Sequence, residues 1–238
     1  MEKKADLFNL KPDDLSWDLP RPTLAAVAAD KLREFILLEK IPPGAFISER
    51  DTAAALGISR TPLRSALVIL EQEGLVDYTP TRRPKVADPS IKELAQNLLV
   101  MGALEALAGE LACRHARKED IARVAQLHEK INQRGRNDDP LAFFRADMRM
   151  HETIVNASGN IPLAETHRQY NARLWRARFI SSRRNAGRQQ TCDEHAAIVK
   201  ALSARDPRAT AAALRTHLAS AIHNIKAALQ ERQETPNP

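Results

Sequence analysis

The sequence has few cysteines and no long apolar run. Its 238 residues include only Cys113 and Cys192, which cannot form a disulfide framework, so a reducing cytoplasm is expected. No stretch approaches the length of about eighteen uninterrupted apolar residues that a membrane-spanning helix needs. Residues 1–22 also lack the apolar core of a signal peptide. These absences argue against secreted and membrane proteins and favour a cytoplasmic one.

Aromatic residues and glycines are also scarce. Aromatics make up 4% of the chain and only eight glycines occur, whereas alanine and leucine dominate. Because alanine and leucine are strong helix formers, the composition predicts a mostly α protein. Residues 1–20 are polar and are expected to form a flexible arm, in which Trp17 has no assigned partner.

Residues 48–86 are the most informative stretch. Ser48 is placed to cap a first helix, and Gly57 supplies a left-handed residue that ends it. Ser59 is placed to cap a second helix, in which three leucines recur at i, i+4 and i+7 and must face inward. The stretch therefore predicts two helices joined by a tight turn.

The outer face of this second helix begins with arginines and hydroxyls at Arg60, Thr61 and Arg64. Such a face suits a major groove, because arginine reads guanine edges bidentately and hydroxyls bind phosphates. Two short strands at 75–78 and 85–86 then flank a basic tip. We interpret the stretch as a winged helix-turn-helix that binds double-stranded DNA; a small helical hairpin with a β-ribbon is the plainer alternative.

Residues 41–76 resemble the winged helix-turn-helix of the GntR family of bacterial transcription regulators. They contain, almost unbroken, the family's PPG, S-E-R and S-R-T-P-x-R-x-A-L-x-x-L-E-x-E-G-L-V segments. The family usually has a glycine in the wing turn, and this tip has none. The resemblance implies six DNA-contacting residues: Arg50, Arg60, Thr61, Arg64, Thr81 and Arg82.

The net charge of +6 does not explain DNA binding by this domain. Residues 21–88 hold ten basic and nine acidic residues, whereas residues 89–238 hold 23 and 16. The prediction therefore depends on where the arginines stand and not on overall charge.

Six further helices are predicted after residue 89, and no strand pattern appears there. Capping residues, prolines and glycines place them at 90–116, 118–134, 140–158, 161–182, 190–204 and 207–232. The predicted architecture is an arm at 1–20, a winged helix-turn-helix domain at 21–88, and an all-α bundle of six or seven helices at 89–235.

Four polar residues in this bundle are candidate metal ligands. Asp147 and His151 stand at i and i+4 on one helix, His195 lies near the start of another, and His217 lies on the last. Imidazole suits zinc, nickel, copper or iron, and mixed nitrogen and oxygen ligation leaves positions for water or a ligand. A histidine on an apolar face is more often a hydrogen-bonded core residue, so spacing alone leaves both alternatives open.

Residues 90–230 are similar to the FCD effector domain of the FadR-type branch of the GntR family. That domain takes its metal ligands from a D-x3-H pattern, a later E-H at a helix start and a final H. The resemblance implies a divalent metal on Asp147, His151, His195 and His217, with zinc favoured over nickel, manganese or iron. It also implies dimerisation and a small carboxylate effector on the metal. The other histidines match no ligand position: His115, His128, His167 and His223.

Seven arginines and no acid lie between residues 166 and 192. Two of them, Arg173 and Arg176, stand at i and i+3 and are predicted to bind the effector's carboxylate. Many FCD domains have an arginine for this purpose where this chain has Met101. The alternatives are a less acidic or bulkier effector, with most of the arginines solvated or at a subunit contact.

The predicted function is a homodimeric, non-enzymatic transcription regulator that binds a palindromic operator and responds to a small organic acid. Repression relieved by the ligand is the commoner family pattern, and activation stays open. The alternatives are direct metal sensing and a metal-dependent enzyme fused to a DNA-binding domain. Only Glu194 is a candidate general base for that enzyme.

Overall fold

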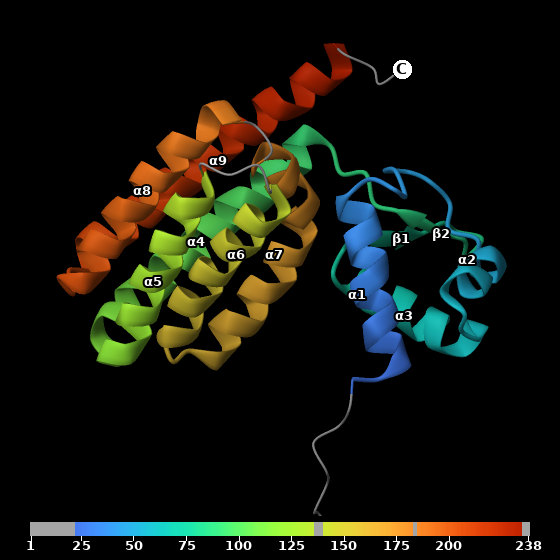
Figure 1. Ribbon diagram of the computed structural model, residues 1–238, viewed down its shortest axis with the longest axis horizontal. Coiled ribbons are helices and arrows are strands. Elements are labelled where there is room, and N and C mark those ends of the chain that lie inside the picture. Colours follow the sequence, from blue (N-terminus) through green and yellow to red (C-terminus); the bar gives the residue numbers. More distant parts are fainter. Residues whose placement is uncertain (1–21, 136–139, 183–184, 235–238) are drawn as a thin grey trace, which may run out of the picture.

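A computed structural model describes residues 22–135, 140–182 and 185–234. Within them, an N-terminal unit of three helices and two strands lies beside a bundle of six long helices (Figure 1). The predicted mostly α fold class is confirmed. The predicted arm at 1–20 and the expected helix cap at Asp139 fall outside the described residues.

The N-terminal unit is built on α1 (Leu24–Leu37), α2 (Glu49–Leu56) and α3 (Arg60–Gln72). Ser48 accepts a hydrogen bond from the backbone of Asp51 and so caps α2, and Gly57 ends that helix with a φ of 67°. Ser59 stands at the N-cap of α3, but its side chain makes no capping hydrogen bond, so the predicted cap is wrong. The inward face of α3 packs on α1 through its leucines: Leu63, Leu67 and Leu70.

The wing consists of β1 (Val76–Tyr78) and β2 (Pro84–Val86), which pair antiparallel with Val76 opposite Val86. The sequence analysis missed a third extended segment at 44–47. Gly44 donates its backbone N–H to Val86 and Ile47 donates to Pro84, both at 2.9 Å. These bonds attach β2 to the chain before α2, so the wing is held from both sides.

The wing tip makes its turn without glycine because Arg82 takes the left-handed conformation, with a φ of 59°. A non-glycine residue loses roughly 1–2 kcal/mol in this conformation. Thr79 stabilises the turn: its carbonyl accepts from the Arg82 N–H at 2.8 Å, and its Oγ1 accepts from the Arg83 N–H at 3.1 Å. The turn therefore projects the Arg82 side chain from a defined backbone.

Six helices form the bundle: α4 (Ile91–His115), α5 (Lys118–Gly135), α6 (Pro140–Ala157), α7 (Ile161–Ser182), α8 (Asn185–Ser203) and α9 (Pro207–Glu234). The predicted capping box is present at the start of α4, where Ser90 and Glu93 bond each other's backbone N–H groups. The start predicted for α8 at residue 190 is wrong. Gly187 lies inside that helix, and a Cβ there would stand 3.3 Å from Nδ2 of Asn224, so close packing on α9 explains this glycine.

The two units meet where α1 faces α7 (Figure 1). Leu37, the last residue of α1, is buried in one hydrophobic cluster with Phe144 and Met148 of α6 and Phe179 of α7. The end of the DNA-binding unit's first helix therefore packs into the bundle.

In the described part of the chain, no single helix is long and apolar enough to cross a membrane. Only α2 and α3 counted together reach the required length and composition, and they are bent by 108°.

Candidate metal centre and nucleic-acid interface

The bundle brings Asp147, His151, His195 and His217 together from α6, α8 and α9. Each offers one ligand atom, and these atoms all lie within 4.8 Å of one another. All four side chains are buried. Three helices thus contribute to one point in the bundle, as the sequence pattern predicted.

Several polar atoms of this cluster are buried without a hydrogen-bond partner: Asp147 Oδ1, His151 Nε2 and both ring nitrogens of His195. Asp147 Oδ1 lies 3.1 Å from His195 Nε2 and 3.4 Å from His151 Nε2. Buried polar groups are normally paired, so such a group of unpaired lone-pair donors needs a cation at its centre. Three imidazoles and one carboxylate suit a divalent metal, zinc above all.

Two carboxylates orient the histidines from outside the cluster. His151 Nδ1 donates to Glu105 Oε2 at 2.6 Å, and His217 Nδ1 donates to Glu194 Oε2 at 2.9 Å. With Nδ1 occupied, each ring has Nε2 left for a metal, as is usual for metal-binding histidines. Glu194, the candidate general base, is therefore held by a ligand histidine and also accepts from Gln190. The sequence analysis assigned neither carboxylate this role.

Burial and charge act in opposite directions on these groups. Burial would lower the pKa of His151, but Glu105 and Asp147 raise that pKa to about 9. Burial lowers the pKa of His217 to about 4, against the effect of Glu194. Burial would raise the pKa of both Asp147 and Glu105, but the neighbouring imidazoles hold the pKa of each carboxyl well below its usual range. Because a metal binds neutral imidazole, its binding displaces a proton from His151.

A cavity of about 40 Å³ adjoins the cluster and is lined by Asp147 and His217. Arg178 of α7 and Arg188 of α8 also line it, and each is only 6% exposed. Arg178 Nη1 donates to Asn171 at 3.2 Å and lies 3.8 Å from Glu105 Oε1. Arg188 Nε donates to the carbonyl of Ser182 at 3.1 Å, and its guanidinium lies over the ring of Phe143. Two buried cations thus stand beside the candidate metal centre.

The predicted effector residues Arg173 and Arg176 lie elsewhere, at the contact between the two units. Arg176 pairs with Glu39 at 3.3 Å and stands 3.8 Å from Asp88. The Arg173 side chain lies where a Cβ on Gly74 would be, at 2.5 Å. Their location does not fit the predicted role, because the inward stripe of α7 passes through Asn171 and Arg178, seven residues apart.

The remaining histidines lie outside the ligand set. His167 is buried and bonds Glu105 Oε1 at 3.2 Å, so it supports the carboxylate that orients His151. His128 stands edge-on to His195 with ring centroids 6.4 Å apart, and its Nε2 lies 3.1 Å from the amide of Asn132. His115 and His223 are exposed.

The six predicted DNA-contacting residues are all exposed: Arg50, Arg60, Thr61, Arg64, Thr81 and Arg82. Arg60, Thr61 and Arg64 lie on the first turns of α3, and Thr81 and Arg82 form the wing tip. Arg64 Nε is 2.7 Å from Glu49 Oε2 of α2, which orients this arginine on the outer face of α3. Arg50 pairs with its neighbour Asp51 at 2.9 Å.

Comparison with known proteins adds families and relatives. The FCD domain family matches residues 98–220, and the family "Bacterial regulatory proteins, gntR family" matches residues 24–86. A Streptomyces ambofaciens protein, named an uncharacterized HTH-type transcriptional regulator in an unstable DNA locus, is 33% identical over 202 residues, 82% of each chain. A Paenarthrobacter nicotinovorans protein named "Probable D-xylose utilization operon transcriptional repressor" is 28% identical over 87% of this chain and 91% of that protein.

Solved structures share the fold. Escherichia coli McbR/YncC superposes with a TM-score of 0.75 at 21% identity, covering 88% of this chain and 98% of that one. A GntR transcriptional regulator from Rhodococcus sp. RHA1 gives a TM-score of 0.72 at 22% identity over 85% and 97%. With the family matches in both units and a relative above 30% identity, this chain belongs to the GntR family of bacterial transcriptional regulators and carries an FCD domain after its DNA-binding domain.

Proposed function

We propose that this regulator controls its affinity for an operator through a small organic acid bound at a divalent metal ion. The observation that carries the proposal is the buried set of Asp147, His151, His195 and His217, whose ligand atoms have so few other partners. Three imidazoles and one carboxylate favour zinc, with nickel, manganese and iron as alternatives. Held by four protein ligands, the ion keeps coordination positions for water or an effector oxygen.

The cavity beside the cluster supports a carboxylate as the effector. Arg178 and Arg188 can bind a carboxylate bidentately where water is largely excluded. Met101, at the position where many FCD domains have arginine, is fully buried and apolar. We therefore assign the effector's acid to Arg178 and Arg188 in place of Arg173 and Arg176.

Helix α6 connects the metal centre with the DNA-binding unit. Asp147 and His151 form one stripe of α6, and Phe144 and Met148 form the adjacent stripe, which packs in the same cluster as Leu37 of α1. A shift of α6 on effector binding would therefore move the end of α1 and the spacing of the recognition helices. The effector must bind the two arrangements with different affinity for this to occur.

DNA recognition is assigned to the six exposed residues of α2, α3 and the wing tip. One winged helix reads few base pairs, so we propose a homodimer on a palindromic operator. Large apolar side chains remain exposed on α4 and at the start of α7, including Leu99 at 67%, Leu107 at 45% and Ile161 at 70%. A second copy would cover this face. The name of the D-xylose operon relative supports repression that the effector relieves.

The first test is operator binding and thermal stability of the purified protein with a panel of small carboxylates, each with and without chelator. The proposal expects one acid class to raise the melting temperature and weaken operator binding only when metal is present. His195→Ala should lower bound metal and remove this response while operator binding persists. Arg188→Gln should weaken the acid response, whereas the exposed Arg168→Gln on α7 should not. Full metal occupancy in His195→Ala would contradict the ligand assignment.

A second candidate is direct metal sensing, which the small cavity favours. A volume of about 40 Å³ holds water more readily than an organic acid. Under this alternative, operator affinity follows metal concentration with no organic ligand present, and no acid in the panel changes it.

A further inference from the structure

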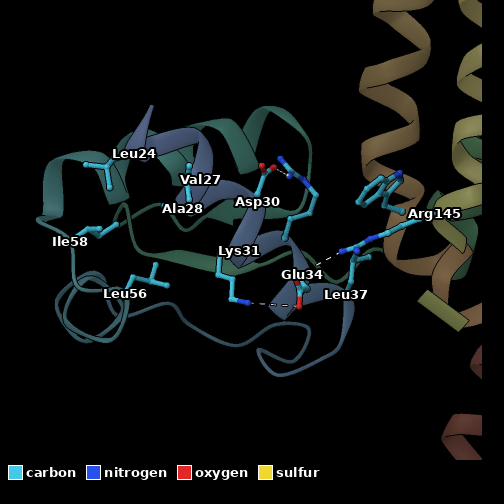
Figure 2. Close-up of a pocket in the computed structure, with 12 residues that line it drawn as sticks. Leu24, Val27, Ala28, Asp30, Lys31, Glu34, Leu37, Leu56, Ile58 and Arg145 are labelled. Carbon is cyan, nitrogen blue, oxygen red and sulfur yellow. Dashed lines mark hydrogen bonds and ion pairs between the residues drawn. The ribbon is translucent and has the colours of Figure 1, made fainter. Parts of the chain in front are cut away.

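A groove of about 590 Å³ runs along α1 at the junction of the two units. Figure 2 shows Leu24, Val27 and Ile58 toward one end, and Leu37 and Arg145 toward the other, where the bundle begins. Leu24 and Val27 are 62% and 51% exposed, although the groove offers them an apolar surrounding. The described residues therefore leave an apolar surface on α1 that nothing covers.

The middle of the groove carries excess positive charge. Lys31 Nζ and Arg145 Nη2 each stand 3.9 Å from the carboxylate of Glu34, and both cations are about half exposed. Arg33 is paired separately with Glu73 at 2.7 Å. Two cations share one carboxylate here, so a further carboxylate between Lys31 and Arg145 would complete the charge balance.

The chain segment that ends beside this groove has matching chemistry. Residues 13–19 read Asp-Asp-Leu-Ser-Trp-Asp-Leu, with three acids and no base. Leu15, Trp17 and Leu19 alternate with polar residues, so an extended segment would present all three on one face. The segment's length also fits: six residues between Trp17 and Thr23 reach about 20 Å when extended, comparable to the length of α1.

The connection into α1 favours a reversal of the chain. Thr23 caps α1 by accepting a hydrogen bond from the Ala26 N–H, so the helix begins at Leu24 beside the groove. Pro20 and Pro22 precede this cap, and prolines are poorly tolerated within a helix beyond its first turn. The segment before Pro20 must therefore leave the helix axis, and the groove is the apolar surface within its reach.

We infer that residues 13–19 fold back into this groove, with Trp17 and the flanking leucines on Leu24 and Val27 and an aspartate between Lys31 and Arg145. The groove is formed by α1 of the DNA-binding unit and by Arg145 and Trp175 of the bundle. The segment would thus fasten the DNA-binding unit to the bundle. This docking requires neither metal nor effector, so it stands or falls independently of the proposed function.

Tryptophan fluorescence of the full chain tests the docking. The protein has two tryptophans, Trp17 and Trp175, so Trp175→Phe leaves Trp17 as the sole probe. In this background we expect a blue-shifted Trp17 emission and acrylamide quenching severalfold weaker than in a peptide of residues 1–22. Emission and quenching equal to those of the peptide would overturn the inference.

Charge reversal identifies the site. Lys31→Glu with Arg145→Glu should return Trp17 to peptide-like quenching, and Asp13→Lys with Asp14→Lys and Asp18→Lys in that variant should restore protection. Arg123→Glu on the exposed face of α5 is the matched control and should change nothing. Protection that survives the Lys31 and Arg145 reversal overturns this groove as the site. Protection that disappears on dilution means that the segment of a second copy binds instead, which overturns the fold-back.

Discussion

Glu105 of α4 holds His151 of α6 through a 2.6 Å hydrogen bond from Nδ1, and both side chains are almost fully buried. The same carboxylate accepts from His167 of α7 through its other oxygen. A residue outside the ligand set thus determines which nitrogen of His151 is available to a metal.

Glu105→Gln should therefore weaken metal binding by roughly 10- to 100-fold, the usual cost of removing such an orienting partner. The amide keeps the shape of the side chain but loses the charge that His151 needs. Metal affinity measured by competition with a chromogenic chelator checks this. Glu93→Gln, on the exposed start of the same helix, is the control and should leave affinity unchanged. Equal affinity in both variants would contradict the orienting role of Glu105.

Gly109 and Gly102 of α4 should respond differently to alanine. A Cβ at Gly109 would lie 2.5 Å from Leu214 Cδ1 and 2.9 Å from Thr210 Cγ2, whereas at Gly102 the nearest atom is Leu218 Cβ at 3.6 Å. Gly109→Ala should lower the free energy of unfolding by about 1–3 kcal/mol through overpacking. Gly102→Ala should be neutral or gain up to about 1 kcal/mol from helix propensity. Denaturant unfolding of both variants tests the α4–α9 contact; equal effects would argue against it.

Arg60→Ala and Arg64→Ala should each weaken binding to the cognate operator by about 1–3 kcal/mol, because the guanidinium groups read base edges from the first turns of α3. Fluorescence anisotropy with labelled operator measures the loss. Arg123→Ala, on an exposed part of α5 away from α3, should bind normally. If both α3 variants keep full affinity, α3 is not the recognition helix.

Arg82→Gly should separate the conformation of the wing from its charge. Glycine accepts the φ of 59° without strain, and this gain of about 1 kcal/mol is offset by its greater freedom in the unfolded chain. Stability should therefore change little, while the slope of log affinity against log salt concentration should fall by about one ion. Arg82→Asn, which also tolerates this conformation, should behave alike. A salt slope that both variants leave unchanged would mean that Arg82 does not contact phosphate.

Helix positions were largely predictable because their signals are local. Ser90 with Glu93, Asp206 with Pro207 and the left-handed Gly57 each act on backbone groups within one turn. Predictions failed where a distant segment decides the outcome. Gly187 looks like a helix breaker in sequence, but its position is set by Asn224 of α9. The strand-like segment at 44–47 depends on pairing with β2, which periodicity does not reveal.

The candidate metal centre divides in the same way. The spacing of Asp147 and His151, together with the later histidines, was enough to name the four residues that the bundle brings together. The arginines beside them were not chosen correctly, because seven arginines in one stretch look alike in sequence. Only the rotation of α7 separates Arg178, which faces the cavity, from Arg176, which pairs with Glu39.

By itself, the sequence determined the helical class, the helix-turn-helix with its outward arginines, and the candidate metal ligands, because these depend on periodicity, capping and residue spacing along the chain. The tertiary structure decided which carboxylates orient His151 and His217, which arginines adjoin the cavity, and how Leu37 enters the cluster of α6 and α7. These features depend on helix rotation and on contacts between residues far apart in the chain. Packing of the whole bundle sets both, and no local pattern encodes them.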